Sequence, residues 1–542
     1  MKIYKKIIAL CLGATLVFTG CSGETDTNSN TETNDDKNIQ VTANFNETGY
    51  PIVDEEMTLS VMFAGATQTE SLESMPSIQN LKELTNIGID VEFIGGDDFR
   101  TKVNLVLASG DLPDVILGGE GLKDVDILNN KEYFYPLDDY LQYAPNVQKM
   151  FEEVPILKKI ATAPDGHIYS LPSYRPFRPQ VNNAWIINTT WLDNLGLDMP
   201  TTTEEFYSVL KAFKEEDANG NGDPNDELPF TTDPSGMFSY QDLFNAFGIT
   251  NTANFVNEKM DIRDGKVRFT PITEEYKEAM KYMRRLLEEE LINPELFTAT
   301  DFWTIGQVDS NGGAKVGVIT SWTAPQMVGQ WADQYEVLLP LEGPNGHRGI
   351  TNELMQTTVV KNPFVIPRTN KNPEATMRWI NEWYGEDMTV QAFFGSFGEG
   401  TKKNDDGTYS ILPPADDTKN PDEWKWIKGV ADPAPVYFSE ELQDKILDAD
   451  FHKLKASYDD LYGDLIEPIE NTFPMMTWAP EESTELSTLY GDIYTYVDRK
   501  AAEWMMNGGI EEEWDDYIKE INKMGYDRLM EIYQTAYDRF MN

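Results

Sequence analysis

The sequence is poor in cysteine and histidine, which removes several kinds of chemistry. It has two cysteines, Cys11 and Cys21, and three histidines in 542 residues. Both cysteines belong to the first 21 residues, so the rest of the chain has no disulfide, nucleophilic thiol or thiolate metal site. No HExxH, GxSxG or phosphate-loop motif is present. These absences argue against Ser-His and zinc hydrolases, and we expect no catalytic residues.

Long apolar runs are missing after the first 18 residues. No later run is long enough to cross a bilayer. At the N-terminus, three lysines precede an apolar stretch from Ile7 to Phe18, and Thr19-Gly20 then precede Cys21. This pattern predicts a secretory signal peptide over residues 1–20, too short for a spanning helix.

Cleavage before Cys21 leaves a cysteine at the mature N-terminus, where a bacterial lipoprotein carries its lipid. We therefore predict lipidation at Cys21, with palmitate, and anchoring outside the cytoplasm on the cell membrane. Phe18 stands where lipoproteins usually have leucine. Plain secretion with cleavage nearby is therefore the alternative, and a periplasm is the alternative to the outer face of a single-membrane cell.

Positive charge is scarce throughout the chain. It has 44 Lys and Arg against 92 Asp and Glu, a formal net charge of −48. A polyanion of this size is repelled by nucleic acid and by anionic membrane surfaces, so we expect no nucleic-acid partner. The same charge opposes self-association, and we expect a monomer.

The length predicts more than one folded domain. The chain has 542 residues, 40% of them hydrophobic, which exceeds what one core usually spans. Residues 21–50 are rich in Ser, Thr, Asn, Asp and Glu. Such a segment cannot bury enough surface to fold, so we predict a flexible tether before a folded part that starts near Pro51.

Strand and helix patterns alternate through the first folded part. Strands are expected at Met57–Phe63, Ile89–Ile94 and Pro113–Leu117, with helices at Ser77–Thr85 and Phe99–Ala108. This order predicts a parallel α/β sheet. Ligands bind such sheets beyond the carboxyl ends of the strands, here at Ala64–Gln68 and Gly118–Gly121.

A second α/β unit follows in the sequence. Strands are expected at Trp185–Ile187, Ala314–Ile319 and Thr357–Ile366, and helices at Thr190–Leu195, from Pro200, at Thr273–Glu290 and at Asn372–Tyr384. Asp405–Tyr409 is a hairpin signal. Residues 481–542 are helical, with breaks at Gly508-Gly509 and Gly525. The pattern predicts two α/β lobes between which the chain crosses several times.

Several short segments resemble one family, the family 1 extracellular solute-binding lipoproteins of bacterial carbohydrate ABC importers. Their order along the chain, together with the lipoprotein signal, carries the resemblance. The segments are Gly49–Val53, Ser109–Val115, Gly166–Pro172, Trp191–Gly196, Phe397–Gly400 and Ile532–Phe540.

The resemblance implies a two-lobe periplasmic-binding-protein-like (type II) fold with a hinge and an interlobe cleft. It divides the chain into a first lobe, residues 51–178 and 362–440, and a second lobe, residues 179–361 and 441–542. It implies crossings near 174–183, near 358–366 and between 400 and 439. It also implies capture of an oligosaccharide or sugar derivative and delivery to the transmembrane subunits of an ABC permease.

One acidic loop has the front half of an EF-hand pattern. Oxygen-bearing side chains stand at Asp217, Asn219 and Asn221, followed by Gly222. Hard oxygens at this spacing suit Ca²⁺. Position 12 is Leu228, so the EF-hand is incomplete. The family often closes such a loop with an Asp-Glu pair, which Asp226-Glu227 matches one residue late.

We therefore predict a structural Ca²⁺ held by Asp217, Asn219, Asn221, Asp223, Asp226 and Glu227. Asp223 is expected to offer its carbonyl. A surface turn without metal is the alternative.

Sugar recognition needs flat aromatic faces and planar polar groups. Trp322 follows a buried strand and resembles a sugar-stacking tryptophan of this family; a core tryptophan is the alternative. The remaining candidates are Trp303 on a loop, Tyr174 and Arg175 beside the first crossing, Glu399 between two glycines, and, more weakly, Trp478. Core packing for Trp303, a hinge salt bridge for Arg175 and a turn for Glu399 stay open.

Three other functions remain possible from the sequence. The ligand could be a peptide or another solute. A lipoprotein that presents ligand to a membrane sensor has the same features without transport. A secreted glycosidase needs only two carboxylates, and no pattern among the 92 acidic residues singles out such a pair.

Overall fold

The computed structural model describes residues 44–118, 122–233, 239–250, 259–416, 419, 421–447 and 450–541. The predicted signal peptide, Cys21, most of the tether and Gly119–Gly121 lie outside these residues. Within them, no helix combines the length and the apolar character that a membrane span requires.

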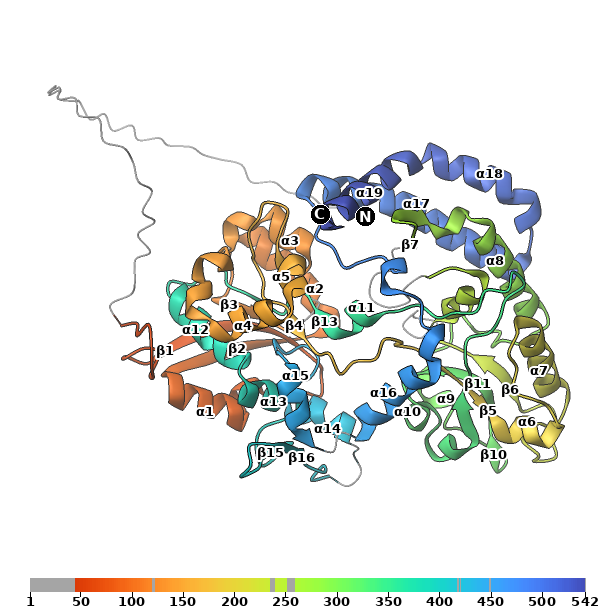
Figure 1. Ribbon diagram of the computed structural model, residues 1–542, viewed down its shortest axis with the longest axis horizontal. Coiled ribbons are helices and arrows are strands. Elements are labelled where there is room, and N and C mark those ends of the chain that lie inside the picture. Colours follow the sequence, from red (N-terminus) through yellow and green to blue (C-terminus); the bar gives the residue numbers. More distant parts are fainter. Residues whose placement is uncertain are drawn as a thin grey trace, which may run out of the picture. The chain divides into compact units, whose positions relative to one another are not determined.

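The first lobe is built on a four-stranded sheet in the order β14-β3-β1-β2. Its strands are β1 (Met57–Gly65), β2 (Ile87–Gly95), β3 (Val115–Leu117) and β14 (Phe364–Val365). β1 pairs in parallel with both β2 and β3, while β14 is antiparallel to β3. The predicted parallel α/β sheet is confirmed, and Figure 1 shows it in the left half of the molecule.

The second lobe has its own four-stranded sheet, in the order β12-β5-β11-β6. The strands are β5 (Ala184–Asn188), β6 (Leu228–Thr231), β11 (Val316–Ser321) and β12 (Tyr335–Val337). β11 is parallel to β6 and antiparallel to β5. All six residues of β11 are buried, because helices cover both faces of this sheet.

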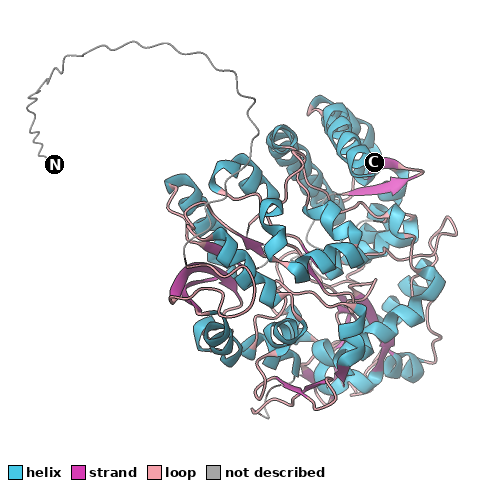
Figure 2. Cartoon of the chain, turned by 60° about the vertical axis from the view of Figure 1, so that its left-hand side comes forward, coloured by secondary structure: helices cyan, strands magenta, loops and turns pink. Residues whose placement is uncertain are grey.

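The helices surround the two sheets, and short strand pairs complete the fold (Figure 2). The helices are α1 (Pro76–Thr85), α2 (Gly96–Ser109), α3 (Asp124–Asn129), α4 (Pro145–Glu153), α5 (Pro155–Ala161), α6 (Thr189–Leu195), α7 (Thr203–Glu215), α8 (Glu274–Glu288), α9 (Phe302–Ile305), α10 (Ala324–Val328), α11 (Leu354–Thr358), α12 (Pro373–Trp383), α13 (Glu386–Phe394), α14 (Pro421–Lys428), α15 (Glu440–Lys445), α16 (Asp450–Tyr462), α17 (Pro480–Asn507), α18 (Ile510–Lys523) and α19 (Tyr526–Met541). The remaining strands are β4 (Ser173–Tyr174), β7 (Met260–Arg263), β8 (Lys266–Phe269), β9 (Asp309–Ser310), β10 (Gly313–Ala314), β13 (Val359–Val360), β15 (Thr401–Lys403), β16 (Tyr409–Ile411) and β17 (Ile446–Leu447).

The C-terminal helices belong to the core of the second lobe. α17 packs along α8, and α19 packs against β8 and α17. Ile493, Tyr494 and Val497 of α17 share one hydrophobic cluster with Met280 and Met283 of α8. The predicted breaks at Gly508-Gly509 and Gly525 are confirmed, since these glycines take positive φ where the three helices meet.

The predicted strand Thr357–Ile366 is wrong as a single element. α11 ends at Thr358, β13 then pairs with β4, and β14 pairs with β3 of the first sheet. Pro363 stands between the two strands and has no N–H for a ladder, so continuous pairing ends there. The exact lobe boundaries proposed from the sequence remain a prediction.

Candidate functional site

Three distant segments lie side by side where the chain passes between the lobes. β4 and β13 form an antiparallel pair, Val359 opposite Tyr174. On the other side of β4, the Tyr174 N–H donates to the Val436 carbonyl at 2.9 Å, and the Phe438 N–H donates to the Tyr174 carbonyl at 3.0 Å. These three segments lie within the stretches in which the sequence predicts crossings. The ring of Tyr174 lies 6.4 Å from the ring of Tyr437, centre to centre.

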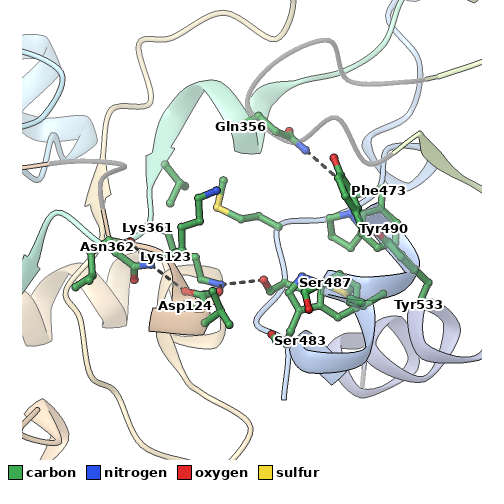
Figure 3. A pocket seen from close by; sticks show the side chains of 18 of the residues that line it. Lys123, Asp124, Gln356, Lys361, Asn362, Phe473, Ser483, Ser487, Tyr490 and Tyr533 are labelled. Atoms are coloured by element: carbon green, nitrogen blue, oxygen red, sulfur yellow. Dashed lines mark hydrogen bonds and ion pairs between the residues drawn. The ribbon is translucent and has the colours of Figure 1, made fainter. Parts of the chain in front are cut away.

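A pocket of about 650 Å³ lies between the two lobes beside β13, and we call it the interlobe pocket. One wall comes from Leu122–Val125 and from Lys361 and Asn362. The facing wall is aromatic and apolar and comes from Phe473–Met476, Trp478, Leu486, Tyr490 and Tyr533. Figure 3 shows the two walls facing each other, with Gln356 above them. This volume falls in the range of small-molecule sites.

The Lys361 side chain joins the two walls of the interlobe pocket, because it pairs with Asp124 on its own wall and donates to the segment of the facing wall. The Lys361 ammonium contacts the Asp124 carboxylate, the Met476 carbonyl at 2.9 Å and the Thr477 hydroxyl at 2.6 Å. The Asn362 amide donates to the other Asp124 oxygen at 2.9 Å. Lys361 therefore ties α3 of the first lobe to the segment that leads into α17 of the second.

The aromatic wall is held rigid by contacts among its own rings. Trp478 and Phe473 pack against Tyr533, with ring centres 4.9 and 5.4 Å apart. Tyr490 stacks on Tyr494 at 3.9 Å and leaves 37% of its surface exposed. Preformed aromatic faces beside polar groups are what sugar binding requires. Trp478, the weakest of the sequence candidates, lines this pocket.

Trp322 directly follows the buried strand β11, as the sequence predicts, but it does not line the interlobe pocket. It packs against the core cluster of the second lobe. The Arg178 guanidinium lies 5.3 Å from the centre of its ring and the Lys455 ammonium 4.7 Å from it. The Trp322 ring thus packs against the core and also lies close to two cationic side chains.

Lys455 is a buried cation that holds α16 to the first crossing. Its ammonium donates to the Asn182 carbonyl at 2.7 Å. Burial lowers the pKa of Lys455 to about 7, against the opposing effect of Asp459, Glu353 and Asp242. Asp459 accepts from the Gln180 N–H at 2.7 Å, so both residues of α16 fasten the same segment.

Arg175 makes the hinge salt bridge that the sequence left as its alternative. Its guanidinium and that of Arg178 both contact one carboxylate oxygen of Asp432. Burial alone would raise the pKa of Asp432, but the charges of Arg178 and Arg175 hold it well below its usual value. Arg175 itself is 5% exposed, so its role here is to join the first and third crossings.

The other two predicted ligand residues, Trp303 and Glu399, do not line the interlobe pocket. Trp303 lies on α9, 46% exposed, with its ring against Phe302. Glu399 lies 3.7 Å from the Lys428 ammonium, and its carbonyl accepts from the Trp424 indole at 3.1 Å. Both stay predictions for sugar binding, without geometric support.

The acidic loop folds back on itself around Asp226. The Asn219 and Asn221 amides donate to the two Asp226 oxygens at 3.1 and 2.9 Å. Ser310 and Asn311 of the neighbouring turn also donate to Asp226. Burial opposes the change, but these hydrogen bonds lower the pKa of Asp226. The Asp223 side chain accepts from the backbone N–H and the side-chain amide of Asn225, and its expected carbonyl role stays a prediction.

Two oxygens in this loop fit a cation. Asp217 Oδ1 and Glu227 Oε2 are buried and have no hydrogen-bond partner in the described residues. Burial, with the charges of Asp226 and Asp217, raises the pKa of Glu227. No three His, Cys, Asp or Glu side chains in the described part of the chain gather closely enough to hold a metal by themselves. A metal here therefore also needs amide and carbonyl oxygens, which Ca²⁺ accepts.

Sequence reasoning missed most of the interlobe pocket. Asp124, Gln356, Lys361 and Phe473 come from segments far apart in the chain and carry no local motif. The sequence signal that could have indicated this wall is the apolar run Phe473–Met476 between two polar stretches, close to the candidate Trp478.

Comparisons with known proteins fit this geometry. A family model described as bacterial extracellular solute-binding protein matches residues 65–390. The fructooligosaccharide ABC transporter substrate-binding protein FusA of Streptococcus pneumoniae is 34% identical over 486 residues, 85% of this chain and 86% of the relative. Lipoprotein LipO of Bacillus subtilis is 27% identical over 394 residues, 70% of this chain and 69% of the relative.

Solved structures agree with the sequence comparisons. FusA in complex with kestose, and its EF-hand mutant in complex with fructo-nystose, each match with a TM-score of 0.79 and 31% identity. Each match covers 90% of this chain and 99% of the solved one. With two α/β lobes, three crossings and a pocket between the lobes, the chain belongs to the family of bacterial extracellular solute-binding proteins.

Proposed function

We propose that this protein captures an oligosaccharide outside the cytoplasm and delivers it to an ABC permease. The observation that carries the proposal is the interlobe pocket, with an aromatic wall from one lobe facing a polar wall from the other. The 34% identity to a fructooligosaccharide-binding relative over most of both chains supports a sugar ligand. The ligand is released unchanged in this proposal, because the similar protein FusA is a substrate-binding protein of a transporter.

Capture depends on the lobes moving about the crossings. A ligand between two lobes stabilises the closed arrangement by its contacts to both and so shifts the open–closed equilibrium. In this chain, Lys361 of the polar wall already bridges to the facing lobe through the Met476 carbonyl and the Thr477 hydroxyl. Closure therefore brings the polar wall and the aromatic wall together around the ligand.

We further propose that Cys21 carries the lipid and that residues 21–50 act as the tether. The sequence pattern around Cys21 and the similarity to a lipoprotein support this assignment. Its test is mass spectrometry of the membrane fraction. A diacylglyceryl group on Cys21 is expected, and Cys21→Ser should leave the protein unlipidated.

We also propose a structural Ca²⁺ in the loop from Asp217 to Glu227. The unpartnered oxygens of Asp217 and Glu227 support these two as anionic ligands. Asn219, Asn221 and the Asp223 carbonyl would add neutral oxygens, and Asp226 lies where the two amides converge. A bound Ca²⁺ would join the loop to the Ser310–Asn311 turn and contribute stability without chemistry.

A thermal-shift screen tests the proposed ligand class. Neutral and acidic trisaccharides, a tripeptide mixture and buffer are compared at equal concentration on the purified mature chain. A sugar at 100 times its dissociation constant stabilises the folded state by about 2.7 kcal/mol, so its melting temperature must rise. Stabilisation by peptides and by no sugar contradicts the proposal.

A further inference from the structure

We propose that the interlobe pocket binds an uncharged sugar residue, with Gln356 accepting a hydrogen bond from one of its hydroxyl groups. The inference rests on the proposed function and narrows it to one ligand chemistry and one specificity-determining residue. Two observations support the inference. The buried donors of the pocket already have hydrogen-bond acceptors, whereas the buried carbonyl oxygen of Gln356 has no donor in the described residues.

The missing hydrogen bond belongs to Gln356. This side chain is 8% exposed and lines the pocket. Its amide nitrogen donates to the Phe473 carbonyl at 3.2 Å, which fixes its orientation. Its carbonyl oxygen Oε1 is buried and has no partner in the described residues. A buried acceptor without a partner costs free energy, and a ligand hydroxyl removes that cost by donating to it.

The buried charges of the pocket, in contrast, are already satisfied. A lysine has three N–H donors, and those of Lys361 have three acceptors, on Asp124, Met476 and Thr477. Both Asn362 amide hydrogens are also used, by Asp124 and by the Leu122 carbonyl at 3.2 Å. The described buried lining therefore offers no cation with a free N–H.

A carboxylate on the ligand would therefore bind unfavourably in the buried part of the pocket. It could accept hydrogen bonds but give none to Gln356, and it would lie near Asp124 without a compensating buried cation. Burying such a charge is costly. Lys123 also lines the pocket, but its side chain is exposed and its charge is screened by water. A neutral sugar ring carries hydroxyl groups that can donate to Gln356, and its binding buries no charge.

The opposite wall fits the rest of such a ligand. Tyr490 and Trp478 line the pocket and offer aromatic surface on which the C–H face of a sugar ring can pack. Ser483 of α17 also lines the pocket and is a neutral polar group. The pocket thus pairs one buried acceptor with an aromatic face, which suits a hydroxyl-bearing ring.

Isothermal titration tests the ligand chemistry first. The wild-type mature chain is titrated with neutral trisaccharides (kestose, maltotriose, cellotriose) and with trigalacturonate and trimannuronate. The tightest binder is expected among the neutral sugars, at least 10-fold ahead of both uronates. A uronate as the tightest binder overturns this inference while leaving the proposed function intact. Binding of none of the sugars contradicts the proposed function itself.

Three variants then locate the site with the best neutral sugar. Ser487 is exposed on α17, so Ser487→Trp fills the pocket without disturbing the core, and Ser487→Ala is its matched control. Ser487→Trp and Gln356→Leu are each expected to weaken binding at least 10-fold, and Ser487→Ala less than 2-fold. Wild-type affinity in folded Ser487→Trp removes the sugar from this pocket. Wild-type affinity in folded Gln356→Leu removes the hydroxyl contact.

Discussion

The carboxylate of Asp432 pairs with two arginines at the hinge. It comes from the third crossing and receives both Arg175 and Arg178 of the first. The arginine side chains are 7% and 12% exposed, so their charges are largely desolvated. Loss of the shared carboxylate leaves two buried cations facing each other, which is far more costly than the loss of a surface pair.

Asp432→Asn is therefore expected to lower the free energy of unfolding by about 3 kcal/mol at neutral pH. Glu485→Gln, which removes the partner of Arg528 on an exposed face, is the matched control and should have little effect. Chemical denaturation of both variants and the wild type measures the difference. An Asp432→Asn variant as stable as Glu485→Gln contradicts the role assigned to Asp432.

The pH dependence of this loss follows from the direction of the pKa shift. The folded pKa of Asp432 lies below its unfolded value, so the folded state releases its proton more readily. Its stabilising contribution is then complete above the unfolded pKa, about 3.9, and disappears as the pH falls through the folded value. The difference between wild type and Asp432→Asn should be constant from about pH 5 to 8 and shrink only below about pH 4.

Substitution of Trp322 tests the sequence prediction that this residue binds sugar. If a sugar ring stacks on it, Trp322→Ala weakens binding by about 1–3 kcal/mol, the range for loss of an aromatic stacking partner. The readout is calorimetric affinity in a variant whose far-UV circular dichroism matches the wild type. An unaltered affinity removes Trp322 from the site and leaves it as a core residue beside Arg178 and Lys455.

Which residues could be predicted depended on how local their signal is. The acidic loop was visible because its oxygens alternate within eleven consecutive positions. Trp322 could be singled out because it directly follows a buried strand. The partner of Arg175 lies 257 positions away, and Gln356 meets Phe473 117 positions away. Only the fold brings such pairs together, and neither side chain is unusual in its local sequence.

At the scale of elements, the period of the apolar residues was a reliable guide. The parallel sheet of the first lobe and the three C-terminal helices follow from alternation, helical spacing and glycine breaks. The prediction failed at Thr357–Ile366, where a run of strand-forming residues, interrupted by Lys361-Asn362-Pro363, crosses between the lobes. There, Pro363 separates two short strands that pair with different strands, β4 and β3. The local sequence does not indicate which strand each one pairs with.

The acidic loop gives an element-scale prediction for the proposed Ca²⁺. Removal of metal with EGTA should lower the melting temperature, and added Ca²⁺ should restore it, because a ligand that binds only the folded state stabilises it. Glu227→Gln should reduce Ca²⁺ affinity at least 10-fold. Asp223→Asn is the matched control, since Asp223 is expected to use its carbonyl. A melting temperature indifferent to EGTA, with no calcium found by elemental analysis, rejects the metal.

At the scale of the whole molecule, the function depends on two lobes that share three crossings. The interlobe pocket receives one wall from each lobe, so a bound sugar contacts both and favours the closed arrangement. Lys361 also bridges the lobes, because it pairs with Asp124 of the polar wall and donates to Met476 and Thr477 of the facing segment. The family membership and the geometry agree on a receptor that binds and releases.

The measurement that tests this account most directly is calorimetric titration of the purified mature chain with neutral oligosaccharides, followed by recovery of the sugar. The account predicts saturable binding of one oligosaccharide per chain, and the recovered sugar should be unchanged. Absence of binding to every sugar, or recovery of hydrolysed sugar from the wild-type protein, would contradict it.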